Sequence, residues 1–384
     1  MANTRSATNM TAIADALGVS AATVSNALSG KGRVSPELAE KIRAKAEEMG
    51  YVPSQTARAL RTGRSGVFGL VLPDIANPLF PRIAQAIEHA AATAGYGVLI
   101  ADSRGDSAAQ TLAIQRLLER DVDGIVIVPR FGTRITDLGC PVSVIDSPST
   151  PGNTVSADHW QGGQLIADHL LSLGHRHFAF VGHTPLSNVQ GDRIGGMKSR
   201  LPKDARFETM WIDRIEAERG RGCPLGVKDL VARGITAFAA TNDLHALRVL
   251  TELQQAGVKV PEDVSVTGFD DLVWSSVVTP GLTTVKQDMA AIADIAVGAL
   301  IDVIEAGPQD APVAENASGT APKRAVAVGR ADRVAMSLVE RQTTGPAAGP
   351  AGGPARAQAN NFPGDDAGAH STSSLTQPLR RNEP

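Results

Sequence analysis

From Gly66 onward, short apolar runs alternate with longer stretches of helical periodicity, and this alternation limits the possible folds more than any other feature. Alternating strand and helix patterns are typical of parallel sheets covered by helices. The first series contains VFGLVLPD, PLFPRIAQAIEHAAATAG, YGVLIAD, AAQTLAIQRLLERD and GIVIVP, and the second contains HFAFVGH, FETMWID, VKDLVARG, TAFAAT, DLHALRVLTELQQAG and VSVTGFDD. We therefore predict an α/β core of two doubly wound lobes with parallel sheets over residues 66–335, with ligands at the C-terminal ends of the strands.

The first fifty residues carry short helical patterns instead. MTAIADAL and AATVSNAL each have apolar residues at helical spacing. Gly18 can end the first helix, Ser20 can cap the second, and Ser35, followed by Pro36, can cap a third. We predict an all-α head over residues 9–52, whose first two helices form a helix-turn-helix.

The second helix of this head has a polar face. Val24 and Leu28 can point inward, and the opposite side carries Ser20, Ala21, Ala22, Ser25 and Asn26. Such a helix fits the major groove of DNA, where Asn can pair with adenine and small side chains can contact a thymine methyl group. The alternative is a simple three-helix core with a polar surface.

A basic segment, SQTARALRTGRSG, follows the head. It can form one or two helical turns with Ala57 and Leu60 on one side and Arg58, Arg61 and Arg64 around them. A single leucine on a helix too short to be stable alone is a poor core residue. It suits a wedge for the minor groove, with arginines on the flanking phosphates. We predict a hinge helix over residues 53–65; the alternative is an exposed basic linker.

The charge distribution agrees with a nucleic-acid contact at the N-terminal end. Residues 1–64 hold nine Lys and Arg against five Asp and Glu, a net charge of +4, which leaves −7 on the remainder of a chain with a total of −3. A basic head on an acidic body suggests DNA as a partner. A solvated surface is the alternative.

The sequence gives no indication of secretion, a membrane span, a metal or a cofactor. The N-terminus lacks an apolar run of signal-peptide length, and Cys140 and Cys223 have neither metal nor disulfide spacing. His175 and His177 are interpreted as structural, because no third ligand is placed near them. Residues 306–324 look like a loop, and residues 340–384, rich in Gly, Pro, Ala and Ser, are predicted to be a disordered tail. We expect a soluble protein of the cytoplasm that acts at the nucleoid and does not bind membranes.

The order of the motifs resembles the LacI/GalR family of bacterial transcriptional regulators. The resemblance covers roughly residues 9–305 and rests on GVSAATVSNALSGKGRVSPELAEKIRAKAEEMGYVPSQTARALRTGRS, LVLPDIANPLFPRI, VDGIVIVP, LGHRHFAFVGH, DRIGGM, TNDLHAL, VPEDVSVTGFDD and LTTVKQD. It implies a periplasmic-binding-protein-like core that dimerises and binds a small effector between its lobes. Beyond Gly307 the resemblance weakens, and RAVAVGRADRV matches the end of the family pattern poorly.

The resemblance also assigns roles to residues. Those expected at DNA are Ser20, Ala21, Ala22, Thr23, Ser25, Asn26, Arg33, Ser35, Tyr51, Ser54, Ala57, Arg58 and Leu60. Those expected at the effector are Asp74, Asn77, Phe80, Asp146, Trp160, Arg193, Asn242, Asp270, Trp274 and Gln287. Ala21 and Ala22 replace side chains that reach bases in many relatives, so Asn26, methyl contacts and operator shape would carry recognition.

The chemistry of the effector residues suits a sugar or related polyol. Asp accepts hydrogen bonds from hydroxyl groups, Asn both donates and accepts, and Arg donates in a fixed fork. Aromatic residues could supply a face for a sugar ring. Structural roles are the alternatives: Asp270 could cap a turn, Arg193 could only pair with an acid, and Trp160 and Trp274 could be ordinary packing residues.

These observations favour a sequence-specific, effector-controlled transcription factor that represses as a homodimer on double-stranded operator DNA. A solute-binding receptor without a DNA function would need a secretion signal. An enzyme on a doubly wound fold is the third alternative, but the chain has no G-x-G-x-x-G after its first strand, no P-loop and no G-x-S-x-G motif. We therefore predict no catalytic residues.

Overall fold

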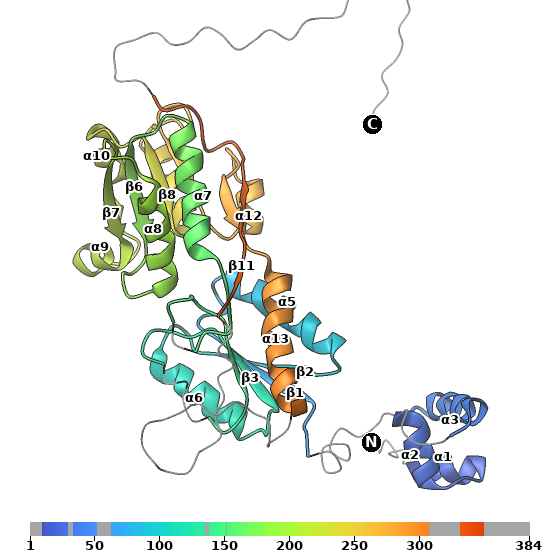
Figure 1. Ribbon diagram of the computed structural model, residues 1–384. Helices are drawn as coiled ribbons and strands as arrows, with labels where there is room; N and C mark the ends of the chain where they lie inside the picture. The colour runs from blue at the N-terminus through green and yellow to red at the C-terminus, as the bar shows by residue number, and fades with distance from the viewer. Residues whose placement is uncertain are drawn as a thin grey trace, which may run out of the picture. The chain divides into compact units, whose positions relative to one another are not determined.

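The computed structural model describes residues 10–29, 34–51, 63–133, 135, 138–150, 152–306 and 331–348. Residues 1–347 form one unit, and residues 348–384 form a second. Within the first unit the described elements form a small helical head and an α/β core (Figure 1). Among the described residues no helix has the length and apolar character needed to cross a membrane.

The head consists of α1 (Met10–Leu17), α2 (Ala21–Ser29) and α3 (Pro36–Glu48). Ile13, Val24 and Ile42 are fully buried at the centre of its core. Gly18 has a φ of +64°, which a left-handed turn after α1 requires. The Ser20 Oγ accepts from the Thr23 N–H at 3.1 Å, and the Ser35 Oγ accepts from the Leu38 N–H at 3.3 Å. The three helices and both serine caps are therefore as the sequence predicted.

Lobe 1 of the core is built on a parallel sheet in the order β2-β1-β3-β4. Its strands are β1 (Val67–Leu72), β2 (Gly97–Asp102), β3 (Gly124–Ile127) and β4 (Val142–Val144), and its helices are α5 (Leu79–Thr93), α6 (Ser107–Leu118) and α13 (Met289–Ala306). The long helix α13 packs beside α5, although the two helices are far apart in the sequence (Figure 1). β1 and β3 are almost wholly buried, as their continuous apolar sequences predict.

Lobe 2 repeats the arrangement with the parallel sheet β7-β6-β8-β9. Its strands are β6 (His177–Gly182), β7 (Arg206–Trp211), β8 (Ala237–Ala240) and β9 (Ser265–Thr267). Its helices are α7 (His159–Ser172), α8 (Asn188–Arg200), α9 (Ile212–Arg219), α10 (Val227–Ala232), α11 (Asp243–Gln255) and α12 (Val273–Val277). The prediction of two α/β lobes with parallel sheets is confirmed.

Two short pairings accompany the passage of the chain between the lobes. β5 (Val155–Ala157) pairs in parallel with β11 (Asp332–Val334), and β10 (Thr284–Lys286) pairs antiparallel with β12 (Ser337–Val339). The chain thus crosses between lobes after β5, after β10 and after β11. The C-terminal ends of the sheets lie toward these crossings, where ligands are expected in folds of this type.

The predicted start of the tail at residue 340 is wrong, because the following residues belong to lobe 2. Thr343 is fully buried, and its Oγ1 donates to the Val266 carbonyl at 2.7 Å while accepting from the Thr283 N–H at 2.9 Å. The Gly345 carbonyl lies 3.1 Å from the Nε2 of buried His175. The tail was predicted from its composition. Composition cannot show that a few small side chains in such a segment have specific hydrogen-bond partners in the folded chain.

Helices α7 and α8 pack side by side (Figure 1), and both have glycines at their contact. A Cβ on Gly163 would lie 2.1 Å from the carbonyl oxygen of Arg193, and a Cβ on Gly196 would lie 2.1 Å from that of Trp160. No larger residue fits at these two positions without separating the helices. This close contact sets the position of Arg193 on α8.

Candidate nucleic-acid interface and effector site

The predicted DNA-binding face of α2 is accessible. Ser20, Ala21, Ala22 and Asn26 are exposed, and Thr23 and Ser25 are half-buried. The opposite side of the helix is in the head core, with Val24 fully buried. The structure thus divides the helix between a packing face and an exposed face of small and polar residues, as the sequence predicts.

The other residues predicted to contact DNA divide into two groups. Ser35 is exposed at the start of α3, and Tyr51 is half-buried, packing against the head core. The remainder lie outside the residues that the structure describes: Arg33, Ser54, Ala57, Arg58 and Leu60. Of the predicted hinge helix over residues 53–65, residues 53–62 lie outside the described part of the chain, and residues 63–65 are described and are not helical.

A buried ion pair occupies the centre of the predicted effector site. Arg193 and Asp270 are only 4% and 3% exposed, and the guanidinium donates to the Asp270 Oδ1 at 3.0 Å. The same oxygen accepts from the Gln287 Nε2 at 2.7 Å. Arg193 also donates to the Thr241 carbonyl and lies 4.4 Å above the ring of Phe269. Three predicted effector residues are therefore in direct contact, and Arg193 does pair with an acid.

Asp270 lies in a turn after β9 whose backbone is unusual for residues with side chains. Its φ is +103° and that of Asp271 is +48°. Such conformations cost free energy and persist where surrounding contacts fix them. Here the Arg82 guanidinium donates to both carbonyl oxygens, at 3.0 and 2.7 Å. The side chain of Asp271 in turn accepts from Arg341 at 2.6 Å.

Asp243 stabilises this turn through hydrogen bonds to the residues that follow it. Its carboxylate accepts from the Leu272 N–H and the Ser275 hydroxyl, both at 2.7 Å, and from the Thr284 hydroxyl. Burial, and then the Asp270 carboxylate, raises the pKa of Asp243 to about 7. The sequence analysis did not select Asp243, although it adjoins the predicted effector residue Asn242.

Asp146 approaches the site from lobe 1. Burial raises its pKa to about 6; the hydrogen bond from Thr150 opposes the rise, and the Asp192 carboxylate of lobe 2 adds to it. Two hydrogen bonds join the lobes here: Ser147 donates to Asp192, and Asn188 donates to Thr150 at 2.9 Å. Asp146 therefore lies where loops of both lobes meet.

His159 connects Asp146 to the buried ion pair. Its Nδ1 accepts from the Arg193 Nε at 3.4 Å, and its ring also hydrogen-bonds the backbone of Asp146. Burial, and then the Arg193 cation, lowers the pKa of His159 well below its usual range, so the ring is neutral. The sequence analysis missed this residue; its place at the first residue after an Asp helix cap was the available signal.

Several predicted effector residues act as local caps. The Oδ1 of Asp74 accepts from the Ala76 N–H at 3.0 Å, that of Asn77 from the Leu79 N–H at 3.1 Å, and that of Asn242 from the His245 N–H at 2.8 Å. In each case the cap occupies one oxygen. The Asn77 and Asn242 amide nitrogens still carry N–H donors.

The aromatic residues differ in their surroundings. Phe80, in the first turn of α5, is half-buried and packs against the hydrophobic core. Trp160 is 44% exposed, and its ring packs over Gly195 on α8. Trp274 is 41% exposed on α12. Trp160 thus has the packing role that was its structural alternative.

His175 and His177 also have protein partners. The ring of His175 bonds to the hydroxyls of Thr236 and Ser265, at 2.9 and 2.8 Å. His177 Nδ1 lies 3.1 Å from the Gly234 carbonyl. Among the residues that the structure describes, no group of three His, Cys, Asp or Glu side chains could hold a metal ion.

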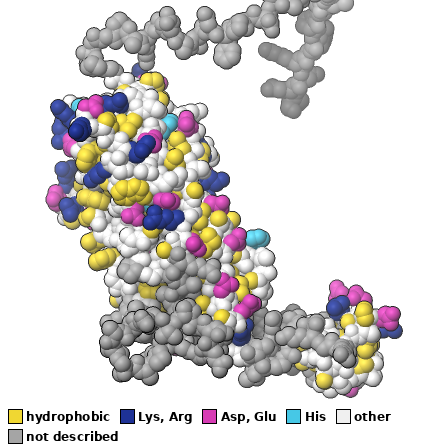
Figure 2. All heavy atoms as spheres, in the orientation of Figure 1, with side chains coloured by type: hydrophobic (Ala, Val, Ile, Leu, Met, Phe, Trp, Pro, Cys, Tyr) yellow, Lys and Arg dark blue, Asp and Glu magenta, His cyan; other side chains and the backbone are white. Residues whose placement is uncertain are grey.

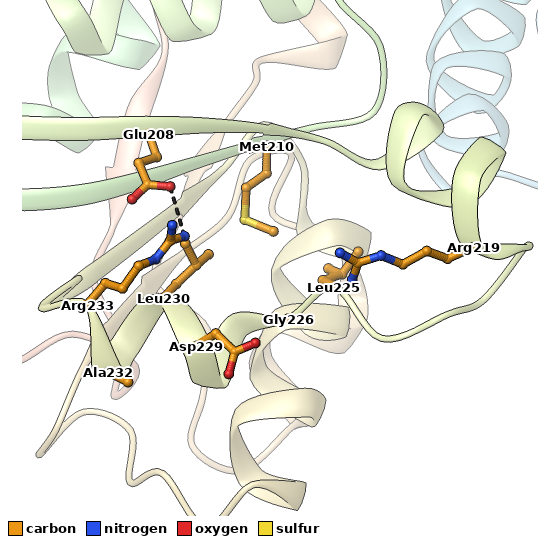
Figure 3. A pocket seen from close by; sticks show the side chains of 9 residues that line it. All are labelled: Glu208, Met210, Arg219, Leu225, Gly226, Asp229, Leu230, Ala232 and Arg233. Atoms are coloured by element: carbon orange, nitrogen blue, oxygen red, sulfur yellow. Dashed lines mark hydrogen bonds and ion pairs between the residues drawn. The ribbon is translucent and has the colours of Figure 1, made fainter.

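A surface cavity of about 410 Å³ lies elsewhere on lobe 2 (Figure 3). Its lining comes from β7, α9, α10 and the loop before α10, and Glu208 and Arg233 form an ion pair across it at 3.0 Å. All ten predicted effector residues lie on other elements. The cavity is therefore separate from the site at the lobe junction.

Comparison with known proteins agrees with this geometry. Residues 9–54 match the family described as bacterial regulatory proteins, lacI family, and residues 167–325 match the periplasmic binding protein-like domain. The chain is 32% identical over 286 residues to the HTH-type transcriptional regulator DegA of Bacillus subtilis, covering 72% of this chain and 85% of the relative. It is 29% identical over 301 residues to a ribose operon repressor of Halalkalibacterium halodurans, covering 76% and 89%.

A solved structure extends the similarity to the whole fold. The lac repressor dimer bound to operator and the anti-inducer ONPF has a TM-score of 0.67 to this chain at 25% identity, covering 88% of this chain and 99% of that one. The head and both lobes therefore have counterparts in one solved protein.

Proposed function

The chain belongs to the lacI family of bacterial regulatory proteins, and from this premise we propose that it represses transcription by binding operator DNA as a homodimer under control of a sugar or related polyol. The observation that carries the proposal is the division of α2 into a buried face and an exposed face of small and polar residues. A helix that only completed a three-helix core would not need a face suited to the major groove.

At DNA, the head of residues 9–52 would place Asn26 at a base edge and the alanines near thymine methyl groups. Residues 53–65 would form the hinge, with Leu60 in the minor groove and its arginines on phosphates. Ser35 and Tyr51 would contact the backbone. The positive charge of this end of the chain supports such contacts.

At the effector, Asp270 is the proposed anchor. Arg193 and Gln287 hold one of its carboxylate oxygens, which leaves the other to accept from a ligand hydroxyl. Asp146 would accept from the side of lobe 1, and the amide of Asn242 would donate. Because a similar protein is named a ribose operon repressor, ribose is the first sugar to test.

Exposed hydrophobic residues support the homodimer. Leu99 and Ile100 are 37% and 49% exposed on β2, an edge strand, and α12 exposes Val273 and Val277, each at 67%. Figure 2 shows one face of the core, where hydrophobic side chains form patches between charged ones. Large exposed apolar side chains on an edge strand mark a surface that another chain covers.

A regulator that binds genomic DNA acts in the bacterial cytoplasm, at the nucleoid, and we infer the same location here. The similarity to transcriptional regulators favours a binding protein over an enzyme. Turnover of a sugar by the purified chain would revive the enzymatic alternative.

The test is selection of genomic DNA. The full-length protein is incubated with sheared fragments of its own genome at physiological salt, and the retained fragments are sequenced. We expect a small set that shares a near-palindromic site. The variant Ala22→Glu, which adds an anion to the exposed face of α2, should lose this enrichment.

The control variant is Ala44→Glu, which adds the same charge at an exposed position of α3. This variant should keep the enrichment of genomic fragments. Retention of fragments in proportion to their abundance by the unmodified protein would contradict the proposal.

A further inference from the structure

Arg82 makes a contact between lobes that no predicted role explains. It lies in the first turn of α5, in lobe 1, and is half-buried. One guanidinium nitrogen donates to the carbonyl oxygens of Asp270 at 3.0 Å and Asp271 at 2.7 Å. Both acceptors belong to the turn after β9, in lobe 2. These hydrogen bonds can exist only while the start of α5 lies against that turn.

The turn itself is held mainly from within lobe 2 and the C-terminal segment. Arg193 and Gln287 hold the carboxylate of Asp270, Arg341 holds that of Asp271, and Asp243 accepts from the next N–H. Arg82 adds the contact from lobe 1. Because two consecutive non-glycine residues here have positive φ, the turn depends on such external contacts.

We propose that Arg82 is a positioning residue that latches lobe 1 onto the Asp270 turn and so holds the core closed. This inference rests on the proposed function insofar as Asp270 receives the effector. The contact of Arg82 then links the position of the Asp270 carboxylate to the orientation of α5. If an effector moves the Asp270 turn and the Arg82 contact is kept, lobe 1 moves with the turn. If the contact breaks, lobe 1 is released.

The chemistry of the contact favours this role. A guanidinium that donates to neutral carbonyls forms charge-assisted hydrogen bonds without neutralising the Asp270 carboxylate. Because the acceptors are backbone carbonyl oxygens, these hydrogen bonds depend on the conformation of the turn and not on the identity of its side chains. Two other hydrogen bonds, which Asp192 and Asn188 make with residues of lobe 1, also join the lobes. Loss of Arg82 should therefore loosen closure without separating the lobes.

The test measures the distance between lobes without DNA or effector. Spin labels are placed in the full-length chain at Ala92→Cys on α5 and Lys228→Cys on α10, both exposed positions, with Cys140 and Cys223 replaced by serine. Pulsed electron resonance then gives the distance distribution. Because neither ligand is present, the outcome does not depend on whether the chain represses transcription.

Arg82→Met and Arg82→Gln keep a long helix-compatible side chain but cannot make the charged contact. We expect each to raise the population of longer distances roughly tenfold relative to the closed one, the size expected for a hydrogen bond to a charged group. Arg82→Lys, which still donates, should change the distribution less. Arg116→Met on α6 is the control and should leave it unchanged.

An unchanged distribution in both Arg82→Met and Arg82→Gln would overturn the latch. An equal shift in Arg116→Met would also overturn it, because the effect would then not depend on the contact with the turn. Thermal unfolding of each variant shows whether the fold is retained.

Discussion

At the scale of single residues, the electrostatic effect on stability is largest at the buried ion pair of Arg193 and Asp270. Each charge has lost most of its water, and each depends on the other for compensation. Ion pairs at the surface, such as Arg233 with Glu208, keep their hydration and contribute little.

The variant Asp270→Asn should therefore destabilise the protein strongly, because it leaves the Arg193 cation buried without a counter-charge. We expect a loss of about 3–5 kcal/mol in the free energy of unfolding, measured by urea denaturation. Arg233→Ala, which breaks the exposed pair, should cost about 1 kcal/mol or less. Equal effects of the two variants would show that burial does not matter here.

Asp243 gives the stability a pH dependence of known sign. In the unfolded chain its carboxyl ionises near its usual value of 3.8, whereas the folded protein keeps the proton until about pH 7. Between these values the folded state binds more protons, so stability falls as pH rises, by at most about 1.4 kcal/mol per pH unit.

Asp243→Asn removes this titration. As the pH rises from 4 to 7, the unmodified protein should lose stability relative to the variant. Above pH 7 the difference between the two should level off. Denaturation curves across this range measure it, and a constant difference would contradict the assignment.

The sequence could predict residue types but not all of their contacts. Arg193, Asp270 and Gln287 were selected together and do meet. His159 and Arg82 were missed, because their partners are distant in the chain and no local spacing brings them together. Asn77 and Asn242 were selected as ligands, and the same polar chemistry lets Asn77 close a turn before α5 and Asn242 cap α11.

At the scale of elements, the contact between α7 and α8 is set by glycines. A Cβ at Gly196 would overlap the Trp160 backbone, whereas a Cβ at Gly191, on the same helix, would meet nothing within 4 Å. The two positions share a helix and differ in their neighbours.

Gly196→Ala should lower the free energy of unfolding by about 1–3 kcal/mol through overpacking. Gly191→Ala should raise it by about 0.5–1 kcal/mol, because alanine favours the helix. Thermal or urea unfolding distinguishes them. A stabilising effect at both positions would mean that the helices are not in close contact.

The C-terminal segment offers a second prediction about an element. A chain that ends at Ala347 should keep the melting temperature of the full chain, because the first unit is intact. A chain that ends at Val339 loses the hydrogen bonds of Thr343 and Gly345 and should melt at a lower temperature. Equal melting temperatures for these two truncations would contradict the assignment of the segment to lobe 2.

Periodicity predicted the helices of the head and the strands of both four-stranded sheets except β4 (Val142–Val144), because helices and buried strands have local signatures. It could not predict β11 or β12. These strands have three residues each, and their partners lie far earlier in the chain: Asp332 of β11 pairs with Val155, 177 positions before it, and Leu338 of β12 pairs with Val285, 53 positions before it. Short strands held by distant partners leave no local pattern.

At the scale of the whole molecule, the chain joins a DNA-binding head to a two-lobed core, and the residues proposed to bind the effector lie near the junction of the lobes. The order of motifs predicted both parts. The coupling between them is a free energy, and linkage requires that it be the same in both directions. A tenfold effect of effector on operator binding corresponds to about 1.4 kcal/mol.

The most direct test of the central claim is operator affinity measured with and without effector. Fluorescence anisotropy would follow full-length protein on its enriched genomic site at fixed salt, with ribose first and then any sugar that raises the melting temperature. We predict at least about a tenfold change in operator affinity at saturating sugar, and an equal change in sugar affinity on saturating operator. Identical operator affinity with and without a sugar that demonstrably binds would contradict the account.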